Sequence, residues 1–71
     1  MAIEKVPTAE LESDLADVMA DIVLCCKAIE LGITDYKNDK GQMESVWGRL
    51  DGNRMVLKII KGELEKRSQN N

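Results

Sequence analysis

LESDLADVMADIVLCCKAI (residues 11–29) and MESVWGRLDGNRMVLKIIKGEL (residues 43–64) are the two stretches that decide the fold. In both, apolar residues recur at alternating spacings of three and four, the heptad pattern of an amphipathic helix. Two long helices are therefore predicted, each with one apolar stripe that needs a neighbouring helix to cover it. The first stripe consists of Leu11, Leu15, Val18, Ile22, Cys25 and Ile29, and the second of Met43, Val46, Leu50, Asn53, Leu57, Ile60 and Leu64.

Signals for helix starts and ends set the bounds of these two helices. Gly32 follows the first stripe and is the natural stop, because glycine readily adopts the left-handed backbone that ends a helix. Asp39 and Gln42 have the spacing of a capping box, which predicts that the second helix begins close by. The predicted organisation is a single helical domain, 1–71, with helix 1 at about 8–31, a loop at 32–39, helix 2 at about 40–67, and flexible tails at 1–6 and 68–71.

The pair Asp51-Gly52 is a counter-signal inside the second helix. It is a strong turn dipeptide, and the apolar segments on either side of it also fit a β-hairpin. A strand requires alternation, however, and Met55-Val56-Leu57 does not alternate. The stripe also keeps its phase across Asp51-Gly52, which a break in the helix would normally reset. We expect a continuous or kinked helix, with a break into two helices or a hairpin as the alternatives.

With 71 residues the chain lies near the lower limit at which one core can hold a fold alone. Proteins of this size usually add disulfides, a metal or a second subunit. Cys25 and Cys26 are adjacent and the chain has no histidine, so neither a disulfide nor a structural zinc site is expected. We interpret the two cysteines as inert core thiols, and a homo-oligomer is the remaining means of stabilisation.

The sequence contains no G-x-S-x-G, P-loop or G-x-G-x-x-G motif, and we therefore expect no enzyme and no cofactor. No signal-peptide pattern is found at its start. The longest apolar run, residues 22–26, is far shorter than the ~20 residues that cross a bilayer. A cytoplasmic protein without a membrane partner is the expectation.

A short loop between two helices predicts that they fold back antiparallel, so the expected fold class is all-α, a helical hairpin. Apolar side chains outside the stripes would stay exposed, and a dimer that forms a four-helix bundle would bury them. In length and two-helix layout the chain resembles the Rop family of plasmid copy-number regulators, helical hairpins that dimerise and bind RNA hairpins. The resemblance is one of architecture and implies no functional residues. The residues expected to mediate oligomerisation or partner binding are Met19, Val23, Cys26, Trp47, Gly48, Gly52, Asn53, Val56 and Ile59.

Charge is unevenly distributed along the chain. Residues 1–35 carry eight acids and two bases, whereas residues 36–71 carry five acids and eight bases. An antiparallel hairpin would bring the two halves together, which is the simplest explanation of the asymmetry. The acids Glu12, Asp14, Asp17 and Asp21 are expected to lie beside the bases Arg54, Lys58, Lys61 and Lys66.

The bases of the second helix have two interpretations. Arg54, Lys58 and Lys61 share one helix face with Trp47, as in a stripe that binds nucleic acid through phosphate contacts and stacking. Alternatively they form a solvated face that pairs with acids of the first helix. Asp51 and Glu65 interrupt the row, which favours the second interpretation.

Two further features of the second helix, Asn53 and the glycine pair, each have two interpretations. Asn53 either specifies register and oligomeric state from within the stripe or closes a turn that begins at Asp51-Gly52. For Gly48 and Gly52 we favour the close approach of another backbone over a locally weak helix or a turn.

We expect a small non-catalytic interaction protein, an adaptor, inhibitor or regulator, that self-associates and binds a protein partner. The alternative is a nucleic-acid-binding regulator that uses the basic face of the second helix. A small-ligand pocket between subunits, lined by Tyr36, Trp47 and basic residues, has no specific support in the sequence.

Overall fold

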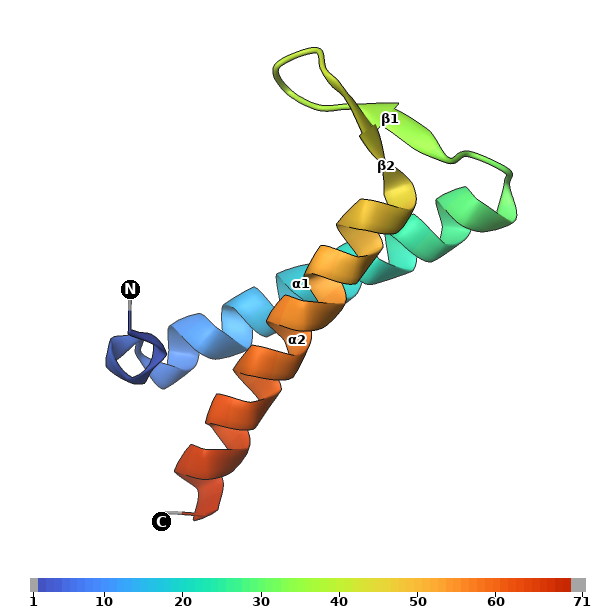
Figure 1. The fold of residues 1–71 in the computed structure, drawn as a ribbon. Coiled ribbons are helices and arrows are strands. Elements are labelled where there is room, and N and C mark those ends of the chain that lie inside the picture. Colours follow the sequence, from blue (N-terminus) through green and yellow to red (C-terminus); the bar gives the residue numbers. More distant parts are fainter. Residues whose placement is uncertain (1, 70–71) are drawn as a thin grey trace.

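The structure is a computed structural model that describes residues 2–69. Two long helices fold back on each other and cross obliquely, and a small antiparallel sheet connects them (Figure 1). We call residues 35–45 the β-arm, because they project away from the helix pair at its closed end. In chain order the elements are the 3₁₀ turn η1 (Ile3–Lys5), α1 (Thr8–Glu30), β1 (Asp35–Lys37), β2 (Met43–Ser45) and α2 (Val46–Gln69).

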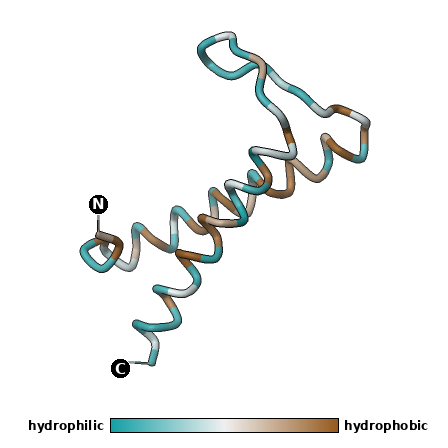
Figure 2. The backbone as a smooth tube through the Cα atoms, in the orientation of Figure 1, coloured by the Kyte–Doolittle hydropathy of each residue, from teal (hydrophilic) through white to brown (hydrophobic). Residues whose placement is uncertain are grey.

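The predicted apolar stripes are the faces that the helices bury against each other. Every residue of the first stripe is buried or half-buried, and so is every residue of the second stripe from Val46 to Leu64. Cys25, Val46 and Leu50 form the main core cluster near the β-arm, and Leu11 and Ile60 are also buried. Hydrophobic positions accordingly follow both helices where they cross, whereas the tip of the β-arm is hydrophilic (Figure 2). The prediction of two long helices packed through these stripes is confirmed.

Gly32 ends α1 as the sequence predicted. Its φ of 80° is in the left-handed region, and its N–H donates to the carbonyl of Ile29 at 3.0 Å. The N–H of Ile33 donates to the carbonyl of Ala28 at 2.9 Å. These two bonds occupy carbonyls that the end of the helix would otherwise leave without partners.

The all-α prediction is wrong between the helices, where the β-arm takes the place of a loop and the first turns of helix 2. Asn38 shapes the turn: its Oδ1 accepts hydrogen bonds from the N–H of Lys40 at 2.9 Å and of Gln42 at 3.0 Å. Gly41 takes the left-handed φ of 77° that this turn requires. Asx side chains start turns as well as helices, which is why the spacing of Asp39 and Gln42 suggested a helix start.

The second helix therefore begins at Val46 rather than near residue 40. Ser45 supplies the cap, since its hydroxyl accepts a hydrogen bond from the N–H of Gly48 at 3.3 Å. Met43, predicted as the first residue of the stripe, lies in β2 and is exposed. From Val46 the helix continues through Asp51-Gly52 to its end, so the continuous helix is confirmed and the break and hairpin alternatives at that pair are excluded.

Arg67 holds the start of the chain against the end of α2. Its guanidinium pairs with Glu63 at 2.9 Å and donates to the hydroxyl of Thr8 at 2.9 Å. It also donates to the carbonyl of Ile3 at 3.1 Å. Part of the tail that we predicted to be flexible, residues 3–5, is thus an anchored 3₁₀ turn, and Ser68 continues α2. Residues 1, 70 and 71 of the predicted tails lie outside the described residues.

The core assignment can be tested with two leucine-to-alanine changes. Leu50 is 7% exposed, so Leu50→Ala should lower the free energy of unfolding by about 2–4 kcal/mol through lost packing and the cavity left behind. Leu31 is 78% exposed, and Leu31→Ala should change that free energy by less than ~0.5 kcal/mol. Urea unfolding followed by circular dichroism measures both. Equal midpoints for the two variants would contradict the core assignment.

Candidate protein-interaction surface

The two helices form a layer that is only one helix thick. The described chain has two long helices, and they pack against each other through one stripe each. Each helix therefore packs against one other helix, and both broad sides of the layer face solvent. The large apolar side chains that stay exposed are Met19, Val23, Leu24, Leu31, Ile33, Met43, Trp47, Met55, Val56 and Ile59.

One broad side combines acids of α1 with apolar residues of α2. A hollow of about 340 Å³ on this side is lined by Glu10 and Asp14 from α1 and by Val56 and Ile59 from α2. Asp17 belongs to the same flank, because spacings of four and three keep residues on one side of a helix. We call this side the acidic face and define it by Glu10, Asp14, Asp17, Val56 and Ile59.

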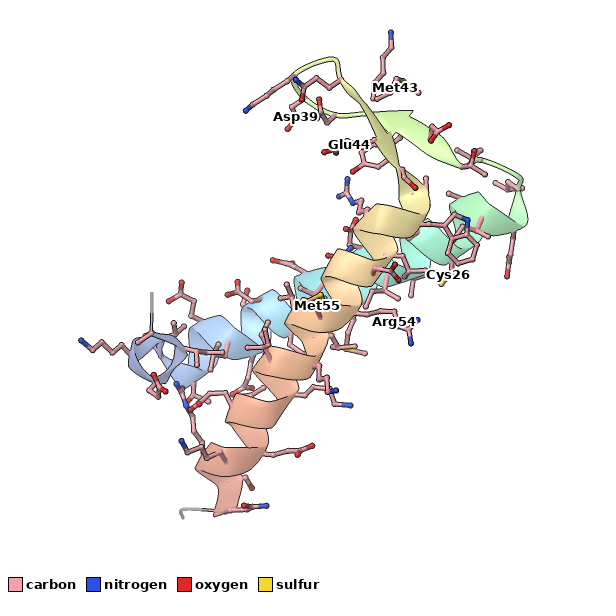
Figure 3. The ribbon with its side chains drawn as sticks, in the orientation of Figure 1. Cys26, Asp39, Met43, Glu44, Arg54 and Met55 are labelled. Carbon is pink, nitrogen blue, oxygen red and sulfur yellow. The ribbon has the colours of Figure 1, made fainter. Side chains whose placement is uncertain are left out.

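The opposite broad side combines bases of α2 with apolar residues of α1. A hollow of about 510 Å³ along α2 is lined by Arg54, Lys58 and Lys61, together with Glu65. Helical periodicity relative to the buried stripe places the exposed residues of α1 at spacings of four and three on this same side. Cys26 of α1 and Arg54 of α2 are seen on the same side of the helix crossing in Figure 3. We call this side the basic face and define it by Arg54, Lys58, Lys61, Trp47, Met19, Val23 and Cys26.

The predicted interaction residues are thus divided between two faces instead of forming one patch. Met19, Val23, Cys26 and Trp47 lie on the basic face, and two others lie on the acidic face. Cys26 is exposed, so the prediction of two core thiols is wrong for it. Cys25 is buried, and this burial raises the pKa of its thiol. Adjacent residues of a helix point in different directions, so only one of the two cysteines can lie in the buried stripe.

The two glycines and the asparagine of α2 have different surroundings. A Cβ at Gly52 would meet nothing within 4 Å, and one at Gly48 would lie 3.8 Å from the Cβ of Ser45. Within residues 2–69, then, no second backbone approaches either glycine. Asn53 lies in the middle of α2, half-buried, and donates a hydrogen bond to the carboxylate of Asp21. The interpretation of Asn53 as a turn residue is therefore wrong.

Most of the predicted charge pairs are also absent from the described part of the chain. Within residues 2–69 the ion pairs are Asp21–Arg49 and Glu63–Arg67. Of the acids and bases expected to face each other, only Asp21 bonds to α2, and its partner is Arg49 instead of a predicted base. The physical reason is that Asp14 and Asp17 project from one face of the layer, whereas the bases Arg54, Lys58 and Lys61 project from the opposite face.

Asp21 and Arg49 form a polar node that joins both helices to the β-arm. Arg49 donates from Nε and Nη2 to the Asp21 carboxylate at 2.7 and 2.9 Å. The Arg49 guanidinium also lies over the ring of Tyr36, 5.1 Å from its centroid, and the Tyr36 hydroxyl donates to Glu44 at 2.7 Å. Sequence reasoning missed Arg49, although its spacing of four from Asn53 places both side chains toward α1.

These contacts shift the pKa values of three side chains of the node. The hydrogen bonds from Arg49 lower the pKa of the Asp21 carboxyl, the bond from Asn53 lowers it further, and burial opposes both. The same contact raises the pKa of Arg49. The bond to Glu44 raises the pKa of Tyr36, since it holds the phenol proton. Both charges of the ion pair are thereby maintained near neutral pH.

A hollow of about 330 Å³ beside this node is lined by Tyr36, Glu44 and Arg49. It corresponds in part to the small-ligand pocket considered from the sequence. Trp47 does not line it, however, and the hollow is open within a single chain instead of lying between subunits.

Asp21→Asn tests the ion pair through its pH dependence. A carboxyl whose pKa is lowered by folding contributes stability above its ordinary value of 3.8, and that contribution disappears as the pH falls through the lower folded value. The variant should unfold more easily than the wild type at about pH 7, by ~1 kcal/mol or less because the pair is partly exposed. This difference should fade in acid. Asp51→Asn, at an exposed position, is the control and should match the wild type in urea unfolding at both pH values. An Asp21→Asn penalty that is independent of pH would show that the charge is not responsible.

Two further facts bear on the class of function. Among residues 2–69 there is no cluster of three or more histidine, cysteine or acidic residues that could hold a metal ion. Neither described helix is sufficiently long and apolar to span a bilayer. The chain matches no protein-family model, no curated protein and no solved structure. Its function has to be inferred from the two exposed faces themselves.

Proposed function

We propose that this protein is a non-catalytic interaction protein that acts by helix-to-helix association, first with further copies of itself. One observation carries the proposal: apolar side chains are exposed on both sides of a layer that is one helix thick. Val23, Met55 and Ile59 are each more than half exposed. In water such side chains favour association with another apolar surface.

The exposed area supports the same conclusion. The chain exposes 5538 Å², whereas a compact monomer of 7.9 kDa is expected to expose ~4,400 Å². Its radius of gyration is 14.5 Å, against ~11 Å for a compact domain of this length. The excess of roughly 1,100 Å² is similar to the ~800 Å² that each partner contributes to a standard interface. A second copy laid on one broad side would hide an area of this size.

Two stacked layers would contain four helices, so the smallest proposed assembly is a dimer with the layout of a four-helix bundle. The surface left open on that assembly suits an amphipathic helix of a protein partner, which would make the chain an adaptor, inhibitor or regulator. We also propose a cytoplasmic location, because the free thiols of Cys25 and Cys26 suit a reducing compartment.

Lysine substitutions on the apolar residues test self-association. Sedimentation equilibrium of the wild type should give a mass above the monomer value of 7.9 kDa at micromolar concentrations. Val56→Lys with Ile59→Lys should shift the mass towards the monomer, since charged groups do not leave water at an apolar contact. Met43→Lys, on the exposed β-arm, is the control and should associate like the wild type. A wild type that stays monomeric up to hundreds of micromolar would contradict the proposal.

Nucleic-acid binding is the second candidate function. It is favoured by the hollow of about 510 Å³ along α2, where Arg54, Lys58 and Lys61 lie together without an ion pair in the described chain. Binding of an RNA hairpin should weaken steeply between about 50 and 200 mM salt, and Lys58→Glu with Lys61→Glu should remove it. Gel retardation measures both effects. Failure of the wild type to retard RNA at low salt would exclude this candidate.

A further inference from the structure

Most charged side chains within residues 2–69 form no ion pair, and the three acids of the acidic face and the three bases of the basic face are among them. The acids are Glu10, Asp14 and Asp17, and the bases are Arg54, Lys58 and Lys61. The ion pairs within residues 2–69 use other side chains, namely Asp21, Arg49, Glu63 and Arg67.

The two sets have the same spacing along their helices. Glu10, Asp14 and Asp17 follow one another at intervals of four and three residues, and so do Arg54, Lys58 and Lys61. Two parallel helices rise by the same ~1.5 Å per residue, so sets with one spacing can come level at all three positions. Parallel alignment would place Glu10 beside Arg54, Asp14 beside Lys58 and Asp17 beside Lys61.

Within one chain this alignment cannot form. The acids line the hollow beside Val56 and Ile59, whereas the bases line the hollow along the other side of α2. In addition, α1 and α2 of one chain are antiparallel, as shown by the bond from Arg67 near the end of α2 to Thr8 at the start of α1. The two sets can meet only when the acidic face of one copy covers the basic face of another.

The order of the two helices on the two faces allows this contact. On the acidic face the acids belong to α1 and the apolar residues to α2, and on the basic face this order is reversed. If a second copy is turned by half a revolution about the normal to the layer, its α1 lies over α2 of the first copy and parallel to it. Its α2 then lies over α1 of the first copy, and the same register brings position 56 level with Glu12 and position 59 level with Leu15.

We propose that copies of this chain associate by laying the acidic face of one on the basic face of the next, with Glu10, Asp14 and Asp17 paired to Arg54, Lys58 and Lys61. This inference rests on the proposed self-association and specifies its geometry. The contact joins two unlike surfaces, so each added copy presents a new free face. Association therefore continues beyond two copies, as a stack or a closed ring.

Charge reversal tests the pairing. One variant carries Arg54→Glu, Lys58→Glu and Lys61→Glu, and a second carries Glu10→Lys, Asp14→Lys and Asp17→Lys. Either variant alone should associate roughly tenfold or more weakly than the wild type, because three pairs of ~0.5 kcal/mol become repulsive contacts. An equimolar mixture of the two should associate again, and so should a chain that carries all six changes. The control, Lys37→Glu with Lys40→Glu and Lys66→Glu, changes the net charge equally but lies off the basic face and should behave like the wild type.

Sedimentation across concentration and salt measures all of these proteins. The expected wild-type mass rises past twice 7.9 kDa with concentration and falls as salt is added. Wild-type association that the charge reversals leave unchanged, or that stops at a closed dimer, would overturn the stacking geometry while the proposed self-association stands. A wild type that is monomeric throughout would overturn both. Retardation of RNA by a monomeric wild type would assign the basic face to nucleic acid instead.

Discussion

Two helices side by side can cover each other along only one stripe, and most features of this molecule follow from that constraint. A helix has a full circumference of side chains, and a single neighbour hides about a third of it. The stripe from Leu11 to Ile29 and the stripe from Val46 to Leu64 are matched to this single contact. Most residues outside them are exposed, and the half-buried exceptions include Asp21, Glu63 and Arg67. Such a core is small, and the polar node at Asp21 and the bonds of Arg67 reinforce it at separate points along the pair.

The helices could be predicted because periodicity is a property of the sequence alone. The stripe residues recur with the helical period regardless of what covers them, so even the weak point at Asp51-Gly52 could be judged correctly. The β-arm could not be predicted in the same way. Its turn depends on Asn38 bonding to two backbone N–H groups and on the left-handed backbone of Gly41, and a similar Asx signal also starts helices.

The site residues show a second limit of sequence reasoning. The uneven charge of the two halves suggested that Asp14 and Lys58 would meet inside the chain. The spacing of charges along the sequence does not say on which face of the helix pair they lie. The face depends on which stripe of each helix is buried and on whether the two helices run parallel or antiparallel. The structure places these charges on opposite faces. It also places Arg49, which the sequence did not distinguish from other bases, at the centre of the contacts among α1, α2 and the β-arm.

The β-arm projects beyond the closed end of the helix pair (Figure 1), and its Tyr36 ring lies beside Arg49 on the flank that carries Asp21. Its strands are three residues long and its turn is polar, and it contributes the ring of Tyr36, which packs against the core cluster of Cys25, Val46 and Leu50. At its tip the turn requires Asn38 and Gly41, whereas the side chains of Asp39 and Lys40 are exposed, so these two positions can change without altering the scaffold.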